Sequence, residues 1–264
     1  MYSKIRLTAA ALGLFVVYPA CAGVQRESST RATAYGSAGV TRKTRFDCEG
    51  DPVSRVTHRQ LGAGGEVVRQ TEGALGGGVS AQAVGGDVTG TWGDVEVDPR
   101  RSPYLLGNVG GFVSLDYEWV GHEIGLGFTF RLDRARTPIP TPWYTLRLGR
   151  YDGAFFEFSA GDRYGFLLSE NVLGVGMGWR FPKGMMRLGL RWGGRMVIDQ
   201  ELSYADGLSL AVDQDGGDVA TYFELRVDVS ERVGLFGAFE VGTQPVAARF
   251  GLSVRLDPIS KPAR

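Results

Sequence analysis

The sequence predicts an all-β fold, an antiparallel up-and-down transmembrane β-barrel of about ten strands (about eight to twelve). Apolar and polar residues alternate with a period of two along many segments, and tight turns alternate with longer connections between those segments. The chain has 40 glycines and 11 prolines, a composition that favours short strands and turns over helices. We expect a signal peptide and a weakly structured N-terminal extension before the barrel.

The first residues, MYSKIRLTAAALGLFVVYPACAG, have the order of a secretory signal, with basic residues, an apolar run and then small residues. We therefore expect residues 1–22 to be a signal peptide. Two outcomes stay open: cleavage before Gly23, or a lipoprotein signal with lipidation at Cys21, although the residues just before that cysteine depart from the lipoprotein pattern. Either outcome leaves Cys48 without an intramolecular partner, so no disulfide framework is expected.

Residues 23–85 are rich in Gly, Ser and Arg and poor in large apolar side chains. Such a segment would not build a core alone, so we expect an N-terminal extension with at most a weak strand near 74–84. The barrel domain is expected at 86–258, followed by a C-terminal tail at 259–264. Once Lys4 and Arg6 are removed, 29 basic residues become 27 against 29 acidic ones, and this balance argues against nucleic-acid binding.

Ten alternating segments follow one another from about residue 87. The connections VGHE, RYDG, FPKG and SER are tight turns, and they alternate with longer connections, as in barrels with short periplasmic turns and longer external loops. Both termini should then lie on the short-turn side. The expected strands are 87–97, 109–120, 123–133, 143–150, 153–160, 172–181, 184–194, 218–229, 233–242 and 246–257.

The two faces of these segments differ in charge. In EIGLGFTFRLD, residues 123–133, the apolar face carries no charge, and the other face mixes charges with glycines. Lysine is almost missing from that second face, and glycine there would leave room for arginines inside a narrow barrel, where they pair with carboxylates. We therefore expect the apolar face to contact lipid. The expected lumenal charges are Asp116, Glu118, Arg131, Arg147, Glu157, Arg180, Arg187, Arg191, Glu224, Arg226, Glu240, Arg249 and Arg255, with Glu123 and Asp228 on the same face.

Aromatic residues lie near the ends of the expected strands, among them Trp119, Trp143, Trp179 and Trp192. Rings at this position are typical of the aromatic girdles that mark both membrane–water interfaces. The segments also have the length, about nine to eleven residues, that a tilted strand needs to cross a bilayer.

Strands such as EIGLGFTFRLD, VLGVGMGWRF and AARFGLSVRL give the chain a resemblance to bacterial outer-membrane β-barrel proteins of the small, OmpA-like kind. The resemblance is architectural and covers roughly residues 87 to 257. It implies a barrel in the bacterial outer membrane, surrounded by lipid. The chain departs from the usual ending of such proteins on a strand-terminal Phe, because Leu256 is followed by DPISKPAR.

Catalytic and metal-binding patterns are weak. Barrel enzymes would need a histidine near the outer rim, and the chain has only His58 and His122. The acidic loop DQDGGD places Asp213, Asp215 and Asp218 together, but it lacks further calcium ligands, so an acidic turn is the better interpretation. We expect a non-enzymatic protein without a cofactor.

Two functions remain open from the sequence. The first is an integral outer-membrane barrel with a narrow, charge-paired lumen and external loops, acting in envelope structure, adhesion or small-solute passage. The alternative is a soluble β-barrel or sandwich lipoprotein, periplasmic or on the cell surface, anchored through Cys21 and binding an apolar ligand inside. The directions of Phe128 and Arg131 should separate the two. The sequence identifies no protein partner.

Overall fold

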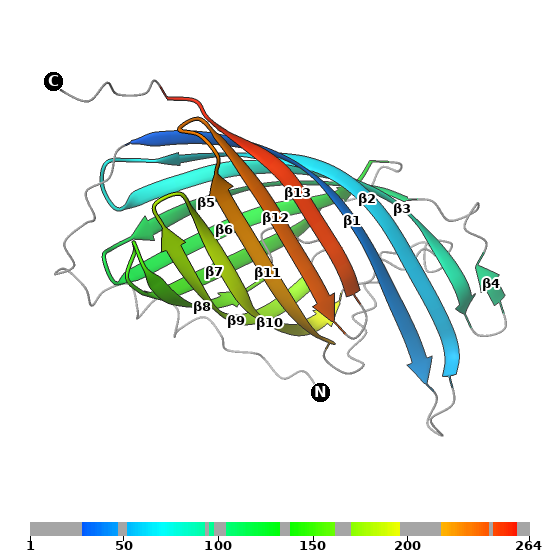
Figure 1. The fold of residues 1–264 in the computed structure, drawn as a ribbon. Coiled ribbons are helices and arrows are strands. Elements are labelled where there is room, and N and C mark those ends of the chain that lie inside the picture. The colour runs from blue at the N-terminus through cyan, green and yellow to red at the C-terminus, as the bar shows by residue number, and fades with distance from the viewer. Residues whose placement is uncertain are drawn as a thin grey trace, which may run out of the picture.

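A computed structural model describes residues 28–46, 52–92, 95–97, 104–132, 138–161, 170–195, 218–242 and 245–257. These residues form one antiparallel sheet that closes on itself, because β1 pairs with both β2 and β13, and β2 also pairs with β3 (Figure 1). Of the thirteen strands, twelve make the barrel wall, and the three-residue β4 pairs with β3. Among the described residues, no helix is long and apolar enough to cross a membrane.

The strands follow one another around the wall in chain order. They are β1 (Ser29–Phe46), β2 (Pro52–Gln70), β3 (Leu75–Trp92), β4 (Val95–Val97), β5 (Tyr104–Asp116), β6 (Val120–Arg131), β7 (Ile139–Gly149), β8 (Ala154–Ala160), β9 (Glu170–Phe181), β10 (Gly184–Arg195), β11 (Asp218–Asp228), β12 (Val233–Gly242) and β13 (Pro245–Arg255).

The sequence predicted the second half of the wall well. Each strand from β5 to β13 overlaps one of the nine segments expected from residue 109 onward. The antiparallel barrel is confirmed, but the expected number of about ten strands is wrong, because twelve strands close the wall. The segment 87–97, expected to be a single strand, contains instead the end of β3 and the short β4.

The expectation of a weakly structured extension at 23–85 is also wrong. Ser29–Phe46, Pro52–Gln70 and most of Leu75–Trp92 lie within or across it, and they are the longest strands of the barrel. Their outward positions carry mainly Ala and Gly, as at Ala34 and Ala63, so the contrast between the two faces is small. An alternation with a period of two is recognised by the difference in hydropathy between the two faces of a strand, and that difference is too small here for the strands to be recognised.

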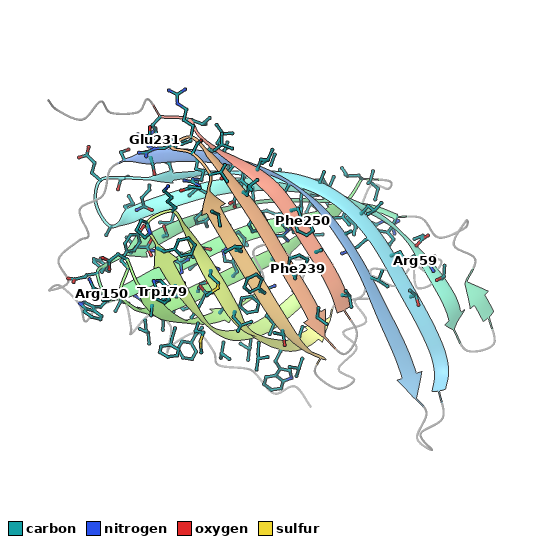
Figure 2. The ribbon with its side chains drawn as sticks, viewed as in Figure 1. Arg59, Arg150, Trp179, Glu231, Phe239 and Phe250 are labelled. Atoms are coloured by element: carbon teal, nitrogen blue, oxygen red, sulfur yellow. The ribbon has the colours of Figure 1, made fainter. Side chains whose placement is uncertain are left out.

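The apolar face of the wall points outward and the charged face points inward. Phe128 of β6 is 42% exposed and Arg131 of the same strand is 7% exposed. Phe239 and Phe250 lie on the outside of neighbouring strands, with ring centroids 5.1 Å apart (Figure 2). This orientation is the one expected for a membrane barrel and the opposite of that expected for a soluble barrel with an apolar interior.

The two ends of the barrel differ. One end has the short turns at 71–74, 117–119, 150–153, 182–183 and 229–232, and both the start of β1 and the end of β13 lie there. At the other end the longest connection is 196–217, between β10 and β11. Beyond the pair Thr41↔Pro245, β1 continues against β2 alone, so the sheet of β1, β2 and β3 projects past the neighbouring strands (Figure 1).

Candidate functional site: a lumen lined by arginines and aromatic rings

Arg147 is the centre of an ionic cluster inside the barrel. It lies on β7, and its three side-chain nitrogens donate to three carboxylates from three other strands. The distances are 3.1 Å to Asp116 on β5, 3.2 Å to Glu123 on β6 and 3.4 Å to Glu157 on β8. All three acids are buried. One planar guanidinium therefore links four strands, which Lys, a point charge, could not do with the same geometry.

The ionic contacts continue around the wall. Arg187 on β10 contacts the other oxygen of Glu157 at 3.4 Å. Arg226 on β11 contacts Glu224 of its own strand at 2.9 Å. The same guanidinium reaches Glu66 on β2 at 3.5 Å, although β2 and β11 are separated by three strands of the sheet. This contact joins two parts of the wall across the lumen.

Two further pairs lie on either side of this band. Arg191 on β10 donates to Glu240 on β12 at 3.1 Å. Arg31 on β1 donates to Asp228 on β11 at 3.0 Å, although two strands lie between them. The intervening Gly234 leaves the path open, because a Cβ there would lie 2.6 Å from the Asp228 carboxylate. Here a glycine makes room for an arginine, as the sequence predicted.

The remaining expected arginines also take inward positions. Arg249 on β13 is 2% exposed and Arg131 on β6 is buried. Arg255 lies at the short-turn end of β13, and Arg180 lies at the same end of β9. Arg180 donates to the backbone carbonyl of Tyr151 at 3.3 Å.

For one expected lumenal residue, Glu118, the prediction is wrong. Glu118 is exposed in the turn between β5 and β6, because β5 ends at Asp116 and the alternation of faces ends with it. Two lumenal charges were missed, Glu66 and Arg31, and both lie on the long N-terminal strands. The alternation of Gln60, Gly62, Gly64 and Glu66 with small apolar residues was the signal that could have found Glu66.

Most inward glycines serve a second purpose, which the sequence reading missed. Aromatic side chains inside the barrel lie against glycines of neighbouring strands. A Cβ on Gly125 would lie 2.1 Å from the Trp143 ring, and one on Gly176 would lie 2.3 Å from the Tyr222 hydroxyl. The same close approach joins Tyr35 to Gly64, Tyr104 to Gly86, Phe112 to Gly78 and Phe155 to Gly178. The rings can therefore lie close against the wall because the glycines opposite them have no Cβ.

Guanidinium groups cover several of these rings. Arg249 lies over Tyr35 at 4.9 Å, Arg191 over Tyr222 at 4.7 Å and Arg226 over Phe236 at 5.0 Å, measured from the guanidinium carbon to the ring centroid. Arg180 lies 4.1 Å from the Tyr151 centroid in the same way. Stacking on a ring restricts the orientation of each guanidinium, and its N–H donors point outward from its edge.

The aromatic girdle differs from the expectation at one residue. Trp119, Trp179 and Trp192 are more than half exposed on the outside, as a girdle requires. Trp143 instead faces inward and is 5% exposed, with its indole nitrogen 3.3 Å from the Glu123 carboxylate. Figure 2 shows Trp179 on the outer surface of β9.

The structure describes only some of the weaker candidate residues. His122 lies on β6 with its Nδ1 2.8 Å from the Tyr144 hydroxyl. No group of three or more potential metal ligands occurs among the described residues. Asp218 begins β11, whereas Asp213 and Asp215 lie outside the described residues, as do Cys21 and Cys48.

No protein-family model and no curated relative matches this sequence. Solved structures do match. An outer membrane channel from Pseudomonas putida F1 is 11% identical, with a TM-score of 0.53, over 91% of this chain and 100% of that chain. The KdgM porin is 8% identical with a TM-score of 0.45, over 84% of this chain and 98% of that chain.

The translocator domain of the autotransporter NalP from Neisseria meningitidis is 10% identical with a TM-score of 0.46, over 93% of this chain and 92% of that chain. At these identities the comparison concerns the fold alone. The twelve-stranded wall, the outward apolar face and the match to the Pseudomonas channel agree on that fold. The chain therefore has the fold of the bacterial outer-membrane β-barrel proteins.

Proposed function

We propose that this protein is an integral barrel of the bacterial outer membrane that lets small solutes pass through its lumen. The observation that best supports this proposal is the polar lining of the lumen. Its wall is lined by charges such as Arg147, Glu157 and Arg226 and by rings held against glycines, instead of a packed apolar core. Arg and Glu side chains that are already paired at the wall have no need of further protein contacts.

The strand number supports passage over a purely structural role. Barrel diameter grows with the number of strands, and about eight strands already give an interior that side chains fill. Twelve strands enclose more space than the ten first expected. Rings that lie against Gly125 and Gly176 sit closer to the wall than a Cβ at these positions would allow, which leaves more of the central space open.

The outward face supports a membrane location over a soluble lipoprotein. Leu173, Met177 and Leu188 are each about half exposed, and a chain in water would expose this continuous apolar band at a large cost in free energy. Lipid is the partner that such a band requires. The protein should therefore stay in the membrane fraction after carbonate extraction and run faster on gels when it is not heated.

A planar-bilayer recording tests the function directly. The full mature chain, refolded in detergent and checked by its heat-dependent gel mobility, should give discrete conductance steps in potassium chloride. A folded, inserted barrel without conductance, together with no uptake of small neutral sugars by proteoliposomes, would contradict solute passage. Such a result would leave envelope structure or adhesion as the function.

A further inference from the structure

We infer that the lumen passes small anions in preference to cations; this inference rests on the proposed passage of solutes and specifies their charge. Among the described residues, the inward-facing charges are nine guanidiniums and seven carboxylates. The guanidiniums belong to Arg31, Arg131, Arg147, Arg180, Arg187, Arg191, Arg226, Arg249 and Arg255. The carboxylates belong to Glu66, Asp116, Glu123, Glu157, Glu224, Asp228 and Glu240.

All seven carboxylates are bound by arginine. Arg147 holds three of them, Arg226 holds two, and Arg191 and Arg31 hold one each. Glu157 receives a second contact from Arg187. A carboxylate held this way has its charge compensated at the wall and has fewer lone pairs to offer a passing cation.

Among the described residues, the guanidiniums outnumber these carboxylates by nine to seven, and each guanidinium carries five N–H donors. Arg180 has no carboxylate within ion-pair distance among the described residues; it donates to the Tyr151 carbonyl and lies over that ring. The inward face of the described residues therefore carries more positive than negative charge.

The size of the effect follows from the lumen's dimensions. Salt screens charges over about 10 Å at 0.1 M, a distance comparable to the width of a small barrel, so an excess of two charges acts on every ion that passes. We expect chloride to permeate about threefold more readily than potassium, as an order of magnitude.

The experiment uses the full mature chain in a planar bilayer with a tenfold gradient of potassium chloride, and the reversal potential gives the permeability ratio. The parent should prefer chloride. Arg180→Glu should abolish most of that preference, since it changes the excess of charge by two without leaving a carboxylate unpaired. The matched control is Arg150→Glu, at an exposed turn outside the lumen, which should keep the parent's ratio.

A second variant shifts the charge the other way. Glu240→Gln keeps the size and one acceptor of the side chain, and it should raise the chloride preference above that of the parent. If heat-dependent gel mobility shows that Arg180→Glu does not fold, the permeability ratio of Glu240→Gln alone decides the test. Parent channels that prefer potassium or do not discriminate, or a folded Glu240→Gln with the parent's ratio, would overturn this inference. A folded parent without any conductance would instead contradict the proposed passage of solutes.

Discussion

Two parts of the barrel wall, β1–β3 and β5–β13, face the same surroundings with different side chains. The outward face of β9 and β10 carries Met177, Trp179 and Leu188, all strongly exposed. The outward face of β1 and β2 carries mainly small residues such as Ala34 and Gly36, with larger apolar ones at Leu61 and Val67, and it also exposes Arg59 and Arg69. The difference teaches that a strand on the outward face of this wall need not carry bulky apolar side chains.

The small side chains leave the outer surface hollowed. A shallow apolar groove of about 920 Å³ runs over the first strands, and Ala34, Gly65 and Ala81 are among the residues that line it. Leu252 and Phe128, from strands on either side, are among the larger residues that line it.

The largest expected effect tests whether both parts of the wall face lipid. Leu188→Arg and Ala34→Arg each place a charge on the outward face near the middle of a strand, where it costs about 2–4 kcal/mol in lipid. Both variants should fold poorly into liposomes. Glu231→Arg, in an exposed turn, is the control and should insert like the parent. Normal insertion of Ala34→Arg alone would break the comparison and place β1 against something other than lipid.

The next effect concerns the rings that lie against glycines. Gly125→Ala brings a Cβ to 2.1 Å from the Trp143 ring, and such overpacking costs about 1–3 kcal/mol. Gly36→Ala, on the outward face with no atom nearer than 3.9 Å, should change the unfolding free energy by less than about 0.5 kcal/mol. Urea unfolding in detergent measures both. Replacement of Trp143 by Leu should remove most of the penalty at Gly125, and equal penalties with and without the ring would exclude the steric explanation.

A smaller effect compares a lumenal ion pair with one in a turn. Arg191→Ala leaves Glu240, a mostly buried acid, without this partner, and its cost lies between those of exposed and fully buried pairs, about 2 kcal/mol. Arg150→Ala breaks a pair with Asp152 whose side chains are both more than half exposed, and it should cost about 0–1 kcal/mol. If thermal unfolding in detergent gives the two variants the same midpoint, bulk water reaches the lumenal pairs freely.

The smallest effect lies at the seam between the first and last strands. The Asp257 carboxylate accepts a hydrogen bond from the Thr30 backbone N–H, and this bond holds the pKa of Asp257 below its ordinary value of 3.8. A lowered pKa gives stability that is present above the ordinary value and is lost as the pH falls through the lowered one. Asp257→Asn should therefore destabilise the barrel slightly at pH 7, and the two proteins should converge as the pH falls well below 3.8. A difference that persists at low pH would contradict the assignment.

The strands of the second half of the wall could be predicted because their two faces differ strongly in hydropathy. The stretch from Ile124 to Arg131 alternates large apolar and polar residues, so strand, face and orientation all follow from a period of two. The N-terminal strands could not be predicted in this way, since Ala and Gly on the lipid face differ little in hydropathy from Gly and Ser on the lumenal face.

The lumenal charges show a different limit. Alternation placed Arg147 and Glu157 on the inside, but it carries no information on which of the many arginines meets which acid, and the contact of Arg226 with Glu66 joins residues 160 positions apart. Alternation also failed for Glu118, where the strand had already ended, and for Trp143, whose place over Gly125 depends on a neighbouring strand.

The seam between β1 and β13 has a consequence for how the molecule is made. In the antiparallel ladder of β1 and β13, Arg31 lies opposite Arg255, and the Leu256 N–H donates to the Thr30 carbonyl at 2.8 Å. The two ends of the barrel sequence therefore meet only when the whole chain is present. The loop that closes here is nearly as long as the protein, and it must close last, after the local hairpins have formed. Because the ends lie side by side, a circularly permuted chain, joined there and opened at the turn 182–183, should assemble the same wall from a different starting strand.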